Sequence, residues 1–120
     1  MNEYHDVLSE LRDPTRELRR TAPDVWAAFA QLHGAAVGDG ALPAATKELL
    51  AFTIAVVKHC DGCIASHAKA LARLGVTPAA VAEALGVALL MDGGPASVYA
   101  PRAWAAYREF AAESDVRASA

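Results

Sequence analysis

An all-α fold is what this sequence predicts, and three observations support it. Hydrophobic residues make up 54% of the 120 residues and charged residues 21%, a balance that excludes a mostly disordered chain. Alanine, the best helix former and a poor strand former, accounts for about a quarter of the chain. No segment alternates apolar and polar side chains as a half-buried strand does. The length suits one domain, so we expect a single domain of about six helices over residues 1–120.

Prolines and glycines divide the first half of the chain into three predicted helices. The first is short and covers residues 14–20, because proline favours the first turn of a helix. The second covers about 23–36, where apolar residues recur at helical spacing. The third follows a Gly-Asp-Gly loop, is opened by Pro43 and covers about 43–59.

Three more helices are predicted in the second half. One covers about 60–74, and Gly75 is well placed to cap its C-terminus. The next covers about 78–91, because Thr77 can cap its N-terminus and a proline follows directly. The last covers about 96–112, after an Asp-Gly-Gly-Pro break.

Charge is spread unevenly along the chain. Residues 1–20 carry nine charged side chains, most simply a solvated face, whereas residues 46–100 carry only eight in nearly three times the length. Several helices in the middle are therefore apolar on more than one face. Such faces predict burial against another subunit, so we expect a homo-oligomer; the alternative is an alanine-rich monomer, since alanine tolerates exposure.

Composition also excludes several classes of protein. The net charge is −3 and the basic residues form no cluster along the sequence, which argues against a nucleic-acid surface. No run of 18 apolar residues is long enough to span a membrane, and the charged N-terminal stretch is unlike a signal peptide. Two cysteines are too few for a disulfide-stapled secreted scaffold. We therefore expect a cytoplasmic protein.

The chemistry is concentrated in the predicted helix that begins at Cys60. At about 100° per residue, Cys60, Cys63 and His67 fall within about 60° of one another, and His67 lies one turn beyond Cys63. Free amides and the helix dipole at an N-terminus favour a thiolate, and the histidine can take the thiol proton. A Cys-x-x-Cys pair can also close a disulfide. These are the parts of a thiol-based redox site.

Glu48 is the carboxylate that could complete this site. It lies at the start of the apolar stretch 49–57, where burial would raise the pKa of a carboxylate and suit a general base or proton relay. The alternative is a first-turn glutamate that is placed there only because the helix dipole favours a negative charge. Glu48 can meet the thiols only if the chain turns sharply near Cys60, or if another subunit intervenes.

The sequence allows two other interpretations of the cysteines. They can be inert buried thiols, although a helix N-terminus beside a histidine is an unusual place for them. They can also bind zinc together with His59 and His67, but four ligands within nine residues of helix give poor tetrahedral geometry. A c-type haem is excluded because Ile64, not histidine, follows Cys63.

The chain carries a glutamate that is followed, after eleven residues, by Cys-x-x-Cys-x-x-x-His. This pattern resembles the signature of the alkylhydroperoxidase AhpD-like branch of the carboxymuconolactone decarboxylase family. The matching positions are Glu48, Cys60, Cys63 and His67. The glycine-rich break at 91–96, followed by Val-Tyr-Ala-Pro at 98–101, also looks like that family's break before its last helix. The resemblance covers about residues 23–112.

The resemblance implies an AhpD-like all-α helical bundle that assembles as trimers or hexamers. It also implies a thiol-dependent peroxidase in which Cys63 attacks a hydroperoxide, Cys60 resolves the sulfenic acid, and Glu48 with His67 relays protons. An analogy with thioredoxin would instead favour Cys60 as the attacking thiol. No metal or organic cofactor is needed, and a dithiol donor, such as a lipoyl-carrying protein, must reduce the disulfide.

One departure from the family affects the expected activity. Asp61 and Gly62 stand between the cysteines, where peroxidase members often carry a histidine, and the charge of Asp61 would raise the thiol pKa.

The sequence leaves two rival functions open. One is the family's acid–base lactone decarboxylase, which works without the cysteine pair, and the other is a redox-sensing disulfide protein without turnover.

The remaining aromatic and histidine residues have simpler interpretations. Core or subunit packing is expected for the aromatic residues at helical spacing, and surface or loop positions for two histidines. These residues are Trp26, Trp104, Tyr107 and Phe110, and His5 and His33.

Overall fold

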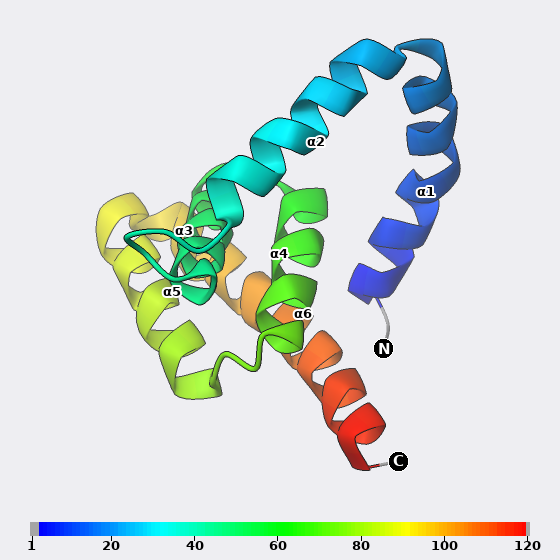
Figure 1. Ribbon diagram of the computed structural model, residues 1–120. Coiled ribbons are helices and arrows are strands. Elements are labelled where there is room, and N and C mark those ends of the chain that lie inside the picture. Colours follow the sequence, from blue (N-terminus) through cyan, green and yellow to red (C-terminus); the bar gives the residue numbers. More distant parts are fainter. Residues whose placement is uncertain (1–2, 120) are drawn as a thin grey trace.

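The computed structural model describes residues 3–119, with side chains over 3–115, and folds them into helices without a strand (Figure 1). This confirms the predicted all-α class. No helix within the described range is both long and apolar enough to cross a membrane. The six helices are α1 (Glu3–Thr21), α2 (Pro23–Val37), α3 (Ala44–Val57), α4 (Asp61–Arg73), α5 (Pro78–Asp92) and α6 (Gly94–Ser119).

The four helices in the middle of the chain, α2 to α5, lie close to their predicted ranges. Residues at the helix ends explain this agreement. Thr77 caps α5, since its hydroxyl accepts the amide of Ala80 at 3.2 Å. Gly75, just after α4, has φ +71°, the left-handed conformation expected of a residue that ends a helix. Cys60 is the N-cap of α4 and lies just outside the helix.

The first and last helices, α1 and α6, are longer than predicted, and each contains a proline. α1 begins at Glu3 rather than at Pro14, and α6 begins at Gly94 and continues through Pro101 to Ser119. An internal proline removes one backbone hydrogen bond. Both prolines are exposed, so water can satisfy the carbonyl that loses its partner. Packing of the rest of each helix offsets the loss.

The core forms where α4 packs between α3, α6 and the first half of α1. Its largest fully buried side chains are Phe52, Ile64, Leu71, Val56 and Val81. Alanines on α4 and α6 are also fully buried, and their small side chains let the helices approach closely. Tyr107 and Phe110 belong to this core, as expected. The Tyr107 hydroxyl donates to the carbonyl of Val76 at 2.6 Å, which ties α6 to the end of α4.

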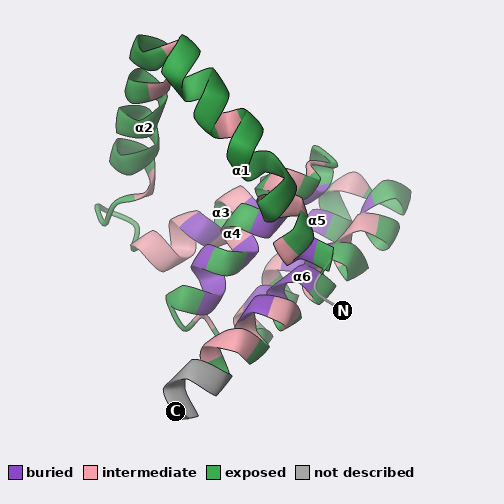
Figure 2. Ribbon diagram, turned by 90° about the vertical axis from the view of Figure 1, so that its right-hand side faces the viewer, coloured by how far each residue is buried: buried purple, intermediate pink, exposed green. Residues whose placement is uncertain are grey.

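α2 lies outside the core and, with the end of α1, projects from the bundle as an arm (Figures 1 and 2). It has no buried residue, although its apolar side chains have the predicted helical spacing. Val25, Phe29 and Leu32 are 68%, 58% and 63% exposed. In the structure of the single chain, this apolar face is therefore uncovered.

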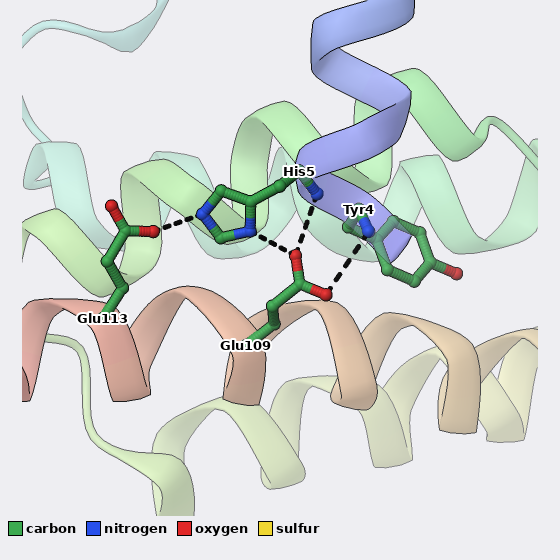
Figure 3. A network of polar contacts seen from close by, with 4 residues as sticks. All are labelled: Tyr4, His5, Glu109 and Glu113. Carbon is green, nitrogen blue, oxygen red and sulfur yellow. Dashed lines mark hydrogen bonds and ion pairs between the residues drawn. The ribbon is translucent and has the colours of Figure 1, made fainter. Parts of the chain in front are cut away.

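His5, for which the sequence predicts a surface or loop position, joins α1 to α6. The Glu109 carboxylate accepts hydrogen bonds from the backbone amides of Tyr4 and His5. The His5 ring is hydrogen-bonded to both Glu109 and Glu113 (Figure 3). Partial burial alone would lower the pKa of His5. The hydrogen bonds and charges of the two glutamates outweigh burial, so that this pKa is raised above its usual value. The ring also packs on Phe110, with centroids 4.3 Å apart.

Candidate active site

A tight turn between α3 and α4 builds the site. The amide of Cys60 donates to the carbonyl of Ala55 at 3.1 Å, and that of His59 donates to Val56 at 3.1 Å. Together these bonds form a Schellman motif, in which the residue after the helix adopts the left-handed conformation. His59 occupies that position with φ +55°, where glycine is usual. The chain therefore makes the sharp turn that the site requires within one subunit.

Ring stacking holds this turn in place. The imidazole of His59 lies on the ring of Tyr99, with centroids 4.2 Å apart and planes 8° apart. The guanidinium of Arg102 lies 5.3 Å from the centroid of the same tyrosine ring. A left-handed conformation is strained for a residue with a Cβ, and packing of this kind lets it persist. α6 thus supports the residue that directly precedes Cys60.

Cys60 and Cys63 are joined by a disulfide, with their Cα atoms 5.2 Å apart. The amide of Cys63 also donates to Sγ of Cys60 at 3.2 Å, so the sulfur caps the N-terminus of α4. Cys60 is half-buried, whereas Cys63 is exposed. A thiolate at either position would be favoured by the free amides and dipole of this helix end.

Glu48 and His67 meet directly, across the α3–α4 contact. Nδ1 of His67 lies 2.8 Å from Oε2 of Glu48, and Glu48 is only 5% exposed. Among the described residues it is the one charged side chain that is buried. With the carboxylate ionised, Nδ1–H donates to it, which leaves Nε2 of His67 as the nitrogen that can exchange a proton with another group.

The cysteines and His67 line one pocket of about 480 Å³. Its other lining residues are the apolar Ala51, Ile54 and Ala55, and Lys58. Glu48 does not line the pocket and lies behind His67. The four predicted residues are thus brought together as two pairs, a disulfide and a carboxylate–imidazole pair, and His67 belongs to both the second pair and the pocket wall. Over the described range, no group of three or more His, Cys, Asp or Glu is arranged to hold a metal ion.

Two neighbours of the site, Lys58 and His33, are not predicted as site residues by the sequence. Lys58 brings a positive charge to the pocket wall, and its place two residues before Cys60 was the available signal. His33 is exposed, as expected, but its ring faces His67 with centroids 6.4 Å and planes 21° apart. No sequence spacing reveals this contact, because His33 belongs to α2 and reaches the site only through the fold.

Comparisons of the sequence and the structure with known proteins identify similar chains. The sequence model of the carboxymuconolactone decarboxylase family matches residues 23–112. An uncharacterized protein of Cupriavidus necator is 39% identical over 98 residues, covering 82% of this chain and 87% of its own. The uncharacterized protein 4 in the cox locus of Paracoccus denitrificans is 37% identical over 93 residues, covering 78% and 84%.

A solved structure has nearly the same fold. It is the apo form of a carboxymuconolactone decarboxylase family protein from Legionella pneumophila, with a TM-score of 0.90 and 36% sequence identity. The match covers 92% of this chain and 99% of that one. The likeness therefore includes most of the arm as well as the bundle.

Proposed function

The chain belongs to the carboxymuconolactone decarboxylase family, and we propose that within it the protein is a thiol-dependent peroxidase that reduces hydroperoxides with Cys60 and Cys63. The observation that carries the proposal is the shared pocket. A cysteine pair able to form a disulfide lines the same pocket as His67, and Nδ1 of His67 is hydrogen-bonded to the buried carboxylate of Glu48. Acid–base chemistry alone would not need the pair.

The reaction can be written from these residues. The Cys63 thiolate attacks the terminal oxygen of the hydroperoxide, so an S–O bond forms as the O–O bond breaks. His67 supplies the proton with which the alkoxide leaves as an alcohol, and Glu48 stabilises the imidazolium formed when His67 takes up the thiol proton. Cys60 then attacks the sulfenic sulfur, and water leaves as the disulfide forms. Exposure favours Cys63 over Cys60 as the attacking residue.

Two opposite charges flank the thiols. Asp61 opens α4 between the cysteines, where its charge opposes thiolate formation, whereas Lys58 lines the pocket and favours it. Lys58 thus brings a positive charge to the pocket from a position before Cys60, whereas peroxidase relatives often carry a histidine between the cysteines. This supports the capacity of the pair to ionise despite Asp61.

The proposal includes partners and a setting. A dithiol donor, such as a lipoyl-carrying protein, regenerates the reduced pair, and a reducing compartment such as the cytoplasm would supply it. We also propose a homo-oligomer, a trimer or hexamer. The exposed apolar face of α2, and Leu90 and Met91 at 80% and 78% exposure at the end of α5, support it.

A thiol count tests the peroxidase reaction. Fully reduced protein is mixed with one equivalent of cumene hydroperoxide without any donor, and free thiols are titrated over time. Both thiols should disappear in the native protein. Cys63→Ser should keep its one thiol, whereas Cys60→Ser should accumulate a sulfenic acid that dimedone traps at Cys63.

The outcomes separate the rival functions. Two thiols that stay free after prolonged exposure would overturn the peroxidase and leave the Glu48–His67 pair as an acid–base catalyst. Loss of both thiols without turnover, when dithiothreitol is supplied with excess peroxide, would indicate a redox-sensing protein instead. Dimedone capture at Cys60 in the Cys63→Ser variant would reverse the assigned roles of the two cysteines.

A further inference from the structure

A groove between α1 and α4 gathers positive charge that the proposed reaction does not use. It has a volume of about 550 Å³, and its lining includes Arg12, Arg16 and Arg19 of α1 and Lys69 of α4; we call it the basic groove. None of its lining residues is acidic. Within residues 3–115, no carboxylate lies within ion-pair distance of any of these four cations. All four are exposed, so an incoming anion can reach them.

The sequence of α1 directs its arginines to this groove. At about 100° per residue, Arg12, Arg16 and Arg19 fall within about 60° of one another, whereas the acidic residues at 6, 10, 13 and 17 centre about 120° away. Like charges three and four residues apart weaken a helix. An anion in the groove would relieve this repulsion, so the charge pattern favours an anionic occupant.

The basic groove adjoins the disulfide. Gly62, which lies between the two cysteines, lines the groove, and a Cβ on it would lie 3.3 Å from Cδ1 of Leu11. α1 therefore packs closely over the first turn of α4. Cys63 is exposed on the neighbouring face of that turn. An occupant of the groove would lie beside the sulfur that a reductant must reach.

We propose that the basic groove docks the acidic surface of the protein that supplies the dithiol. The inference rests on the proposed function, which requires such a donor. One donor thiolate attacks the Cys60–Cys63 disulfide, forms a mixed disulfide and releases one cysteine thiolate; the donor's second thiol then displaces the other cysteine. Two electrons and two protons pass to the pair, and the donor becomes a disulfide.

Local charge must produce this docking, because the whole chain carries a net charge of −3. Its distant field repels an acidic partner, so attraction can come only from a region where cations are concentrated. The groove is such a region, and it lies outside the pocket that receives the peroxide. Peroxide and donor would thus approach α4 on different faces.

Two synthetic dithiol peptides test the proposal. Both contain one Cys-x-x-Cys segment, followed in one by four glutamates and in the other by four glutamines. The disulfide is formed with diamide rather than peroxide, so the test does not depend on peroxidase activity. Stopped-flow rates of disulfide reduction are then compared at low salt. The native protein should react about tenfold faster with the glutamate peptide, and the ratio should fall towards one at high salt.

Charge reversal locates the effect. In Arg12→Glu/Arg16→Glu the ratio should fall to one or below, while the rate with the glutamine peptide stays unchanged. Arg20→Glu/Arg108→Glu makes the same net change at exposed positions outside the groove and should keep the native ratio. The neutral Arg12→Gln/Arg16→Gln variant should give an intermediate ratio, which guards against misfolding of the reversed one.

Three results would overturn the docking proposal. They are a native ratio near one, a ratio that Arg12→Glu/Arg16→Glu leaves unchanged, and an equal slowing of that variant with both peptides. Failure of the peroxidase would appear separately, as thiols that cumene hydroperoxide does not oxidise.

Discussion

We propose that Glu48 acts through His67, because its carboxylate bonds to Nδ1 of His67 and does not line the pocket of the thiols. Glu48→Gln removes the charge but keeps an oxygen that can accept the Nδ1 hydrogen of His67, so the packing should survive. We expect peroxide-driven loss of thiols to slow on the order of 100-fold, because the imidazolium loses its counter-charge. Thiol titration against time measures this, and circular dichroism checks the fold.

Glu83 provides the control for that variant. It is an exposed glutamate on α5, so Glu83→Gln makes the same chemical change away from the site and should leave the rate unaltered. An unchanged rate in Glu48→Gln would mean that the buried carboxylate serves the packing of α3 on α4 and not the relay of protons.

At the level of single residues, the sequence was most informative where chemistry follows one helix. Cys60, Cys63 and His67 are spaced so that any α-helix brings them to one side, and the structure places all three in one pocket. The Glu48–His67 bond needed the left-handed turn at His59, which no residue type signals there. The contact of His33 with His67 depends on tertiary structure alone.

The docking of α1 on α6 should depend on pH. The pKa of His5 is raised in the folded protein, so the folded state binds the His5 proton more tightly than the unfolded chain does. The resulting stabilisation is fully present below the unfolded pKa of about 6.5 and is lost as pH rises through the higher folded value. His5→Gln should remove this dependence.

Urea unfolding of the native protein and His5→Gln, from about pH 5.5 to 9, measures the effect. The native protein should be the more stable at the acidic end, and the difference should shrink as pH rises. A difference that stays constant or grows with pH would show that His5 contributes by packing on Phe110 and not by its charge.

Helix by helix, the sequence was reliable where an end carries its own chemistry. Thr77, Gly75 and Pro23 mark real ends of helices. The prediction that a helix begins at Pro14 was wrong, because proline is typical of a first turn but here lies inside α1. Packing of residues before it, such as Tyr4, extends the helix towards the N-terminus. Local sequence cannot show that a distant helix will stabilise those residues.

The whole molecule leaves apolar surface that a single subunit does not cover. We expect a trimer or hexamer in solution, with the α2 face buried between subunits. Phe29→Glu/Leu32→Glu places two charges on that face and should lower the molar mass measured by sedimentation or light scattering, because buried unpaired charges are costly. Single-subunit mass for the native protein would contradict the oligomer.

Gln31 lies on the same helix, is exposed and is already polar, so Gln31→Glu is the matched control and should keep the native mass. A native mass in Phe29→Glu/Leu32→Glu as well would show that α2 is not the surface that subunits share.

At this scale the sequence predicted the fold class and an apolar middle, but not the charge distribution. Three arginines share one face of α1, but Lys69 meets them only in the fold, across a separation of at least fifty residues of sequence. For the arm, the sequence predicted the helix and its apolar spacing but not how that helix packs. Its apolar spacing predicted a packed helix, and only the fold shows that this apolar face has nothing packed on it within the chain.

The disulfide spans a sequence separation of only three residues, which has a consequence for folding. A cross-link stabilises a protein chiefly by restricting the conformational entropy of the unfolded chain, and the restriction grows with the length of the loop it closes. For so short a loop the chain-entropy account gives on the order of 2 kcal/mol, against roughly 5 for a loop of 100 residues. This disulfide therefore contributes less to the folding free energy than a long-range cross-link would, and we expect the chain to stay folded when the pair is reduced.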